Sequence, residues 1–178
     1  MIQNAKIYLA EALISLMRRK PIEDISIKDL VKRAGVSRMT YYRYFTSKEE
    51  VLECYMDYIL EEYDTQIDQN KSYDFHSYEH ILDSLIFFQK YKDFVLCLQA
   101  AGMESLLLTA LNDYVKKQSD FTEEKSVRCY PFYFYAGALY NIYMHWITQD
   151  SSTPATELAA IITKMDPLRP FTRKDMTA

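Results

Sequence analysis

Glycine, proline and cysteine are all scarce in this chain. Its 178 residues include three glycines, five prolines and three cysteines. Together with a hydrophobic content of 49%, so few turn residues favour a compact helical protein. Cys54, Cys97 and Cys129 form no C-x-x-C pair, which fits reduced, mostly buried thiols, with a redox sensor as the alternative.

Long hydrophobic runs and catalytic motifs are also missing. No run of about 18 apolar residues occurs, and Lys6 and Glu11 interrupt the N-terminal segment. We therefore expect neither a membrane span nor a signal peptide, and a cytoplasmic location. The chain has no G-x-S-x-G, no glycine-rich phosphate loop and no H-E-x-x-H. We expect no enzyme activity and no cofactor.

Charge is unevenly distributed along the chain. The net charge is −4, which by itself argues against nucleic acid as a partner. Residues 1–46, however, hold nine Lys or Arg against four Asp or Glu, a net charge of +5, which leaves −9 for residues 47–178. A basic N-terminal part on an acidic remainder predicts that one end of the protein is attracted to phosphates.

One segment, ISIKDLVKRAGVSRMTYYRYFTSKEEVL, predicts two short helices joined by a glycine turn. Ser26 is the predicted N-cap of the first helix, and apolar residues then repeat at helical spacing as far as Gly35. Ser37 is a second N-cap, which starts a helix at Arg38 after a turn of about three residues. This spacing indicates a helix-turn-helix.

The second of these helices has two distinct faces. A hydrophobic staple from Val36 places Tyr41 inward, and Phe45 follows one turn later on the same side. The opposite arc suits the DNA major groove, because arginine can bond guanine and tyrosine hydroxyls reach phosphates. A solvated helix face is the alternative interpretation. The residues of this arc are Arg38, Met39, Thr40, Tyr42 and Arg43.

The run GVSRMTYYRYFTSKEEVL resembles the signature of TetR/AcrR-type transcriptional regulators, G-V-S-x-x-T-x-Y-x-[HY]-F-x-[ST]-K-E-x-L, without a gap. The resemblance is strong over about residues 4–60. It implies DNA-backbone contacts from Ser37, Thr40, Tyr42 and Lys48, and base readout by Arg38, Met39 and Arg43. Tyr44 occupies a position that is usually histidine or tyrosine. With the N-cap Ser26, these residues form the predicted DNA-binding set.

Helical periodicity continues through the rest of the chain. A first helix over residues 3–19 would complete a three-helix head, and a connecting helix would follow over residues 48–65, with Ser47 as its N-cap. A helix beginning around Ser77 and two more up to residue 115 would precede a C-terminal pair. The predicted fold is all-α with about nine helices: a DNA-binding head over residues 1–47, and a helical effector-binding and dimerisation body over residues 48–178.

The helices between residues 78 and 115 carry the predicted effector pocket, since the resemblance implies that this region encloses one. Methionine there can adapt to ligand shape. Plain core packing is the alternative interpretation of each residue. The predicted lining is Phe87, Phe88, Cys97, Met103, Leu107 and Tyr140.

Residues 128–147, RCYPFYFYAGALYNIYMHWI, are apolar or aromatic on nearly every face, so a helix there must be covered on both sides. We expect it to pair with a last helix, capped by Thr153 and starting at Pro154, in a four-helix dimer interface. A pocket lined by tyrosines, Asn141 and Trp146 is the alternative. The predicted interface residues are Phe132, Ala136, Leu139, Tyr143, Leu158, Ile161, Ile162 and Met165.

His76 and His80 are four residues apart, the only metal-like spacing in the sequence. Such a pair binds a divalent ion only when both rings share a helix face. Solvated histidines on a surface turn are the favoured interpretation, and we predict no metal site.

These observations predict a homodimeric DNA-binding transcriptional regulator that recognises a roughly palindromic operator in double-stranded DNA. The favoured mode is a repressor that an unknown small-molecule effector releases from DNA. The alternative is an activator or adaptor of the same fold that responds to a protein partner.

Overall fold

The computed structural model describes residues 2–68, 75–118 and 129–165. Within these ranges it contains nine α-helices, one short 3-10 helix and no strand, which confirms the all-α prediction. No helix in these ranges is long and apolar enough to cross a membrane. The chain divides into two compact units: unit 1 comprises Met1–Lys71 and Asp93–Leu106, and unit 2 comprises Ser72–Lys92 and Leu107–Ala178.

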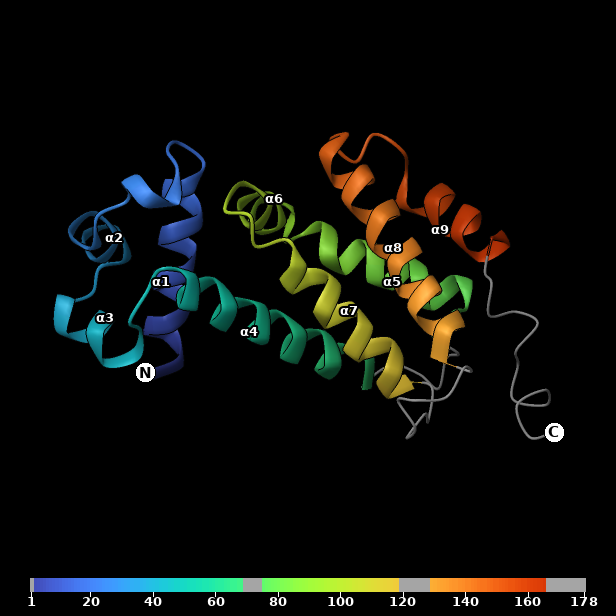
Figure 1. Ribbon diagram of the computed structural model, residues 1–178, viewed down its shortest axis with the longest axis horizontal. Helices are drawn as coiled ribbons and strands as arrows, with labels where there is room; N and C mark the ends of the chain where they lie inside the picture. The colour runs from blue at the N-terminus through green and yellow to red at the C-terminus, as the bar shows by residue number, and fades with distance from the viewer. Residues whose placement is uncertain (1, 69–74, 119–128, 166–178) are drawn as a thin grey trace. The chain divides into compact units, whose positions relative to one another are not determined.

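Unit 1 is built around its first helix, α1 (Ile2–Met17), which packs against the next three α-helices (Figure 1). Buried leucines such as Leu9, Leu13 and Leu30 form its core. Each such side chain contributes about 1.5–3 kcal/mol by leaving water. The further elements of this unit are the 3-10 helix η1 (Ile22–Asp24), α2 (Ile27–Ala34), α3 (Arg38–Tyr44), α4 (Glu49–Asp68) and α6 (Lys92–Ala100).

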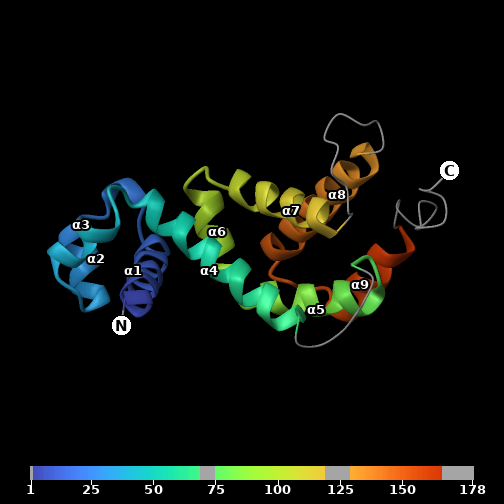
Figure 2. The ribbon, with the colours of Figure 1, turned by 90° about the horizontal axis from the view of Figure 1, so that it is seen from below.

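The predicted helix-turn-helix is present in α2 and α3 (Figure 2). Ser26 Oγ accepts a hydrogen bond from the Asp29 amide at 3.1 Å, and Ser37 Oγ accepts one from the Thr40 amide at 3.0 Å. Between the helices Gly35 adopts φ +67°, a left-handed conformation that glycine adopts without a steric penalty. Both predicted N-caps and the glycine turn are confirmed.

The start of α4 is held by two reciprocal caps. The Ser47 hydroxyl accepts from the Glu50 amide at 3.1 Å, and the Glu50 carboxylate accepts from the Thr46 amide at 2.7 Å and from the Thr46 hydroxyl. The hydrogen bonds from Thr46 lower the pKa of Glu50. The connecting helix therefore begins at Glu49, one residue later than predicted, and continues to Asp68.

Unit 2 contains α5 (Tyr78–Gln89), most of α7 (Ser105–Gln118), α8 (Tyr130–Thr148) and α9 (Ala155–Lys164). The Ser77 hydroxyl accepts a hydrogen bond from the His80 amide at 3.2 Å and so caps α5. This helix begins where the sequence predicted it. Helices α5 and α9 pack against each other. A buried cluster of Val115, Phe132, Tyr135 and Ala136 joins α7 to α8.

The structure divides the predicted dimer-interface residues into two groups. Phe132, Ala136, Leu158 and Ile162 are buried inside unit 2, whereas Ile161 and Met165 are exposed. Leu139 and Tyr143 are half-buried, and Tyr143 donates its hydroxyl to the Phe88 carbonyl at 3.0 Å. Because the first three turns of α8 lack a polar face, their sequence does not show which apolar stripe turns inward. The large apolar side chains exposed on α8 and at α9 are Tyr130, Tyr133, Phe134, Ile161 and Met165.

The cap of the last helix also differs from the prediction. Pro154 rather than Thr153 is the N-cap of α9, and no side chain caps it. The Thr153 carbonyl instead accepts a hydrogen bond from Trp146 Nε1 at 2.8 Å. Trp146 is buried and Asn141 Nδ2 bonds the Gly137 carbonyl at 2.7 Å, so the polar nitrogens of these two residues of the alternative ligand pocket have partners within the chain.

His80 is not the solvated histidine that its sequence position suggested. It is buried, its ring stacks on Tyr114, and its Nε2 lies 2.8 Å from the Tyr114 hydroxyl. Among the described residues no group of three or more His, Cys, Asp or Glu is arranged to hold a metal ion. Of the three cysteines, which are free thiols, only Cys97 is buried.

Candidate nucleic-acid interface

Helix α3 presents the two faces that its sequence predicted. Tyr41 is only 1% exposed and Phe45 is also buried, so both side chains hold the helix to the head. On the opposite arc Met39 is 73% exposed and Tyr42 is 60% exposed. Arg38 and Arg43 are exposed on the same arc. Two guanidinium groups beside a thioether and a phenol form a surface that can bond phosphates and base edges.

Tyr41 packs against this arc from the core side of α3. Its ring meets the Tyr42 ring edge to face at a centroid distance of 5.2 Å and the Phe45 ring at 6.1 Å. Burial raises the pKa of Tyr41 to about 12. The ring therefore restrains Tyr42 from the core side while the phenol of Tyr42 stays at the surface.

Polar residues next to the arc are also accessible. Ser26 and Ser37 are exposed, and the Ser37 and Thr40 hydroxyls lie 2.9 Å apart. Tyr44 is half-buried, and the Lys6 ammonium from α1 lies 5.6 Å from the centroid of its ring. This cation–π contact brings a positive charge from α1 next to the predicted DNA-binding set. Lys6 is not part of the predicted set, because nothing in the local pattern of α1 shows that it reaches α3.

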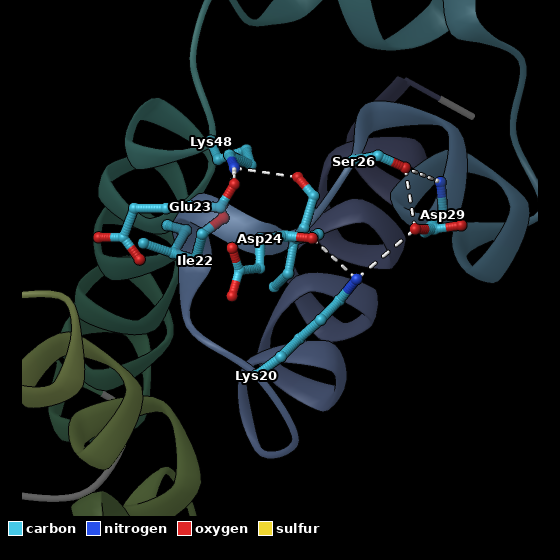
Figure 3. Close-up of polar contacts among 8 residues, drawn as sticks. Lys20, Ile22, Glu23, Asp24, Ser26, Asp29 and Lys48 are labelled. Atoms are coloured by element: carbon cyan, nitrogen blue, oxygen red, sulfur yellow. Dashed lines mark hydrogen bonds and ion pairs between the residues drawn. The ribbon is translucent and has the colours of Figure 1, made fainter.

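Lys48 has a different environment from the rest of the predicted set. Its ammonium donates to the backbone carbonyls of Ile22, Glu23 and Ile25, at 3.4 Å for Glu23 and 2.9 Å for Ile25 (Figure 3). Its side chain is half-buried, whereas the residues of the α3 arc are mostly exposed. A phosphate contact of Lys48 would therefore compete with its hydrogen bonds to these backbone carbonyls.

The predicted effector-pocket residues fall into both units. Phe87, Phe88, Leu107 and Tyr140 belong to unit 2, whereas Cys97 and Met103 belong to unit 1. Cys97 is buried in unit 1 and directs its thiol to the Ile14 carbonyl of α1 at 3.7 Å, and burial raises its pKa to about 11. Its side chain thus packs against the head, and the common pocket stays a prediction.

A three-helix head with an exposed basic arc on the second helix of a helix-turn-helix defines a class of DNA-binding domain. Residues 9–54 match the family described as "Bacterial regulatory proteins, tetR family". Residues 9–54 are accordingly a DNA-binding domain of this family.

Curated relatives match a short stretch of the chain. That stretch is similar to the HTH-type transcriptional regulator EthR of Mycobacterium tuberculosis (strain H37Rv), with 46% identity over 50 residues. Its identity to EthR of Mycolicibacterium smegmatis is 43% over 53 residues. These matches cover 28% and 30% of this chain, and about a quarter of the relatives' length, 23% and 24%.

A solved structure resembles nearly the whole chain. The dihydroxyacetone kinase operon activator DhaS superposes with a TM-score of 0.62, over 90% of this chain and 93% of that protein, at 19% sequence identity. At this identity the likeness concerns the fold alone. This likeness of fold covers the C-terminal helices as well as the head.

Proposed function

We propose that the protein is a homodimeric regulator that binds a roughly palindromic operator in double-stranded DNA and, as a repressor, leaves it when a small molecule binds. The observation that carries this proposal is the exposed arc of α3 on a tetR-family head. In the proposed division of labour, residues 1–47 bind DNA and residues 48–178 bind the effector and dimerise.

On DNA, the proposed readout comes from Arg38, Met39 and Arg43, and the hydroxyls of Ser37 and Tyr42 contact phosphates. The net charge of +5 in residues 1–46 would orient the head on the duplex, and the acidic remainder would be repelled from it. Affinity should therefore fall steeply as the salt concentration rises.

The proposed dimer is formed by the exposed aromatic face of α8 with the exposed end of α9. Tyr130 and Phe134 lie one turn apart and are 69% and 67% exposed, and Ile161 and Met165 are exposed at α9. Contiguous exposed aromatic area of this kind marks protein interaction sites. Two heads joined in this way would read half-sites about 34–36 Å apart, or a multiple of that spacing.

Release by an effector requires a mechanical link to the head, and α6 supplies a candidate within unit 1. Arg18 of α1 pairs with Asp93 at 2.9 Å, and the Tyr55 ring of α4 meets the Phe94 ring edge to face at 5.1 Å. Together with the Cys97 contact to α1, these interactions tie α6 to α1 of the head and to the connecting helix α4. A ligand that displaces α6 would therefore move α1 and α4 with it.

Selection of fragments from the source genome by the purified protein tests the DNA-binding role. The expected result is enrichment of a site with two related half-sites, which the wild-type protein binds and an Arg43 variant binds more weakly. Selection of no common sequence contradicts the proposal. The selected promoter then supplies the duplex for the measurements below.

A separate experiment must distinguish repression from activation, because a protein named an operon activator shares this fold. Deleting the gene and measuring transcription from the selected promoter should raise its output if the protein is a repressor. A fall in output supports the activator alternative. Small molecules related to the neighbouring gene's product can then be tested for release of the duplex, and release only by a protein partner favours the adaptor.

A further inference from the structure

The backbone just before α2 is held by two lysines. The carbonyls of Ile22, Glu23 and Ile25 accept hydrogen bonds from the Lys48 ammonium. The carbonyl between them, that of Asp24, accepts one from the Lys20 ammonium at 2.9 Å. Four successive carbonyls of η1 and its C-cap thus point at lysines, as Figure 3 shows.

The two lysines lie next to different helices of unit 1. Lys20 follows the C-terminal end of α1, and Lys48 immediately precedes α4. The Ile25 carbonyl belongs to the residue before Ser26, the N-cap of α2. Lys20 also lies 3.6 Å from the carboxylate of Asp29, whose amide is bonded by that cap. The contacts therefore tie the ends of α1 and α4 to the N-terminus of α2.

The ammonium of Lys48 has little capacity left for DNA in this arrangement. A lysine ammonium has three N–H donors, and three backbone carbonyls lie around this one. The carbonyls at the end of a helix carry partial negative charge, which favours a cation there. A phosphate contact would require Lys48 to withdraw at least one donor from this site.

We propose that Lys48 is a positioning residue for DNA binding: it fastens η1 to the start of α4 and so sets the placement of α2, against which α3 packs. The proposal rests on the proposed function, because it concerns the same DNA-binding head. It replaces the direct phosphate contact expected for Lys48 with an action through the backbone of residues 22–25.

The test compares Lys48→Met with Lys32→Met, which removes the same charge from an exposed position of α2. Lys48→Arg is the conservative variant, since a guanidinium can also donate to several carbonyls. Binding is measured with the selected duplex and with an unrelated duplex of equal length, over a range of salt concentrations. Circular dichroism fixes a temperature at which each variant is folded, and stoichiometric titration gives the active fraction. If Lys48→Met does not fold, Lys48→Gln, which keeps two N–H donors, carries the same comparison.

Lys48→Met is expected to weaken binding of the selected duplex about tenfold more than Lys32→Met does. Binding of the unrelated duplex should change equally in the two variants. For Lys48→Met, the plot of log affinity against log salt concentration should have the same slope as the plot for Lys32→Met. Lys48→Arg should recover most of the affinity for the selected duplex.

Two results would overturn the positioning role. A slope for Lys48→Met that is smaller than that of Lys32→Met by about 1.8, which is about 0.9 for each subunit of the dimer, with equal losses on both duplexes, would show a lost phosphate contact. A lower melting temperature with unchanged affinity per folded molecule would show a merely structural lysine. Failure of the wild-type protein to prefer the selected duplex would instead remove the proposed function itself, before any variant is compared.

Discussion

Helices α3 and α8 both expose tyrosine, but they do so in opposite chemical settings. On α3, Tyr42 lies on an arc with Arg38 and Arg43. On α8, Tyr130 and Phe134 are exposed on a helix without a charged residue. An aromatic side chain beside guanidinium groups suits a polyanion, whereas an uncharged aromatic stripe suits another apolar surface. Exposed aromatic area thus marks both surfaces, and the neighbouring charge distinguishes their partners.

The two helices also differ in how clearly their sequences mark the inside. Tyr41 of α3 and its C-cap residue Phe45 are buried, and the other residues of α3 except Met39 carry polar groups, so one orientation satisfies the pattern. The first three turns of α8 are apolar or aromatic on every side, so several orientations of that segment satisfy its pattern equally well. The pair Phe132 and Phe134 separates the inside of α8 from its outside.

The largest effect is expected for Phe132→Ala. Phe132 is buried in the cluster between α7 and α8, so its truncation should lower the free energy of unfolding by about 3–5 kcal/mol. Urea unfolding at several protein concentrations measures this loss, which should not depend on concentration. For the exposed Phe134, Phe134→Ala should cost much less, and its cost should grow with protein concentration because it acts through association. Equal, concentration-independent losses would contradict this orientation of α8.

Self-association should respond most to Phe134→Glu. A carboxylate placed in an apolar interface should raise the dimer dissociation constant about hundredfold, in the range of about 2–4 kcal/mol typical of interface hot spots. Sedimentation equilibrium measures the constant. Tyr8→Glu changes an exposed aromatic residue of α1 in the same way and should leave it unchanged. A Phe134→Glu protein that dimerises like wild type would place the interface elsewhere.

On the α3 side, Arg43→Ala should weaken binding of the selected duplex by about 1–3 kcal/mol and relax the sequence preference at one base position of each half-site. Fluorescence anisotropy with the selected duplex and single-base variants measures both effects. Lys32→Ala removes one charge outside the α3 arc and should weaken all duplexes alike. Unchanged binding by the Arg43 variant would show that α3 is not the reading helix.

The smallest effect is expected at Tyr41, whose buried hydroxyl has no hydrogen-bond partner among the described residues. Tyr41→Phe removes this group and should raise the free energy of unfolding by about 1 kcal/mol at pH 7. The raised pKa of Tyr41, about 12 against an ordinary 10.0, means that folding favours the protonated phenol. The stability that depends on the phenol staying protonated is complete below pH 10 and is lost as the pH rises through 12. Urea unfolding at pH 7 and pH 11 should therefore show a larger advantage for Tyr41→Phe at pH 11.

Much of the head could be predicted because its signals are local. The N-caps Ser26 and Ser37 and the turn at Gly35 each lie within a few residues of the atoms that they satisfy. The outward arc of α3 followed from one staple residue and helical spacing. The contacts of Lys48 could not be predicted, because its acceptors lie more than twenty residues earlier in the chain.

The amino-acid sequence by itself determined the helical fold, the helix-turn-helix and the basic N-terminal end, since caps, periodicity and charge act over short stretches of chain. Only the tertiary structure decided which stripe of α8 is buried, that His80 bonds Tyr114, and that Lys48 bonds backbone carbonyls. The physical reason is common to all three. An apolar stripe, an imidazole or an ammonium can satisfy itself with several partners, and only the packing of distant segments selects one of them.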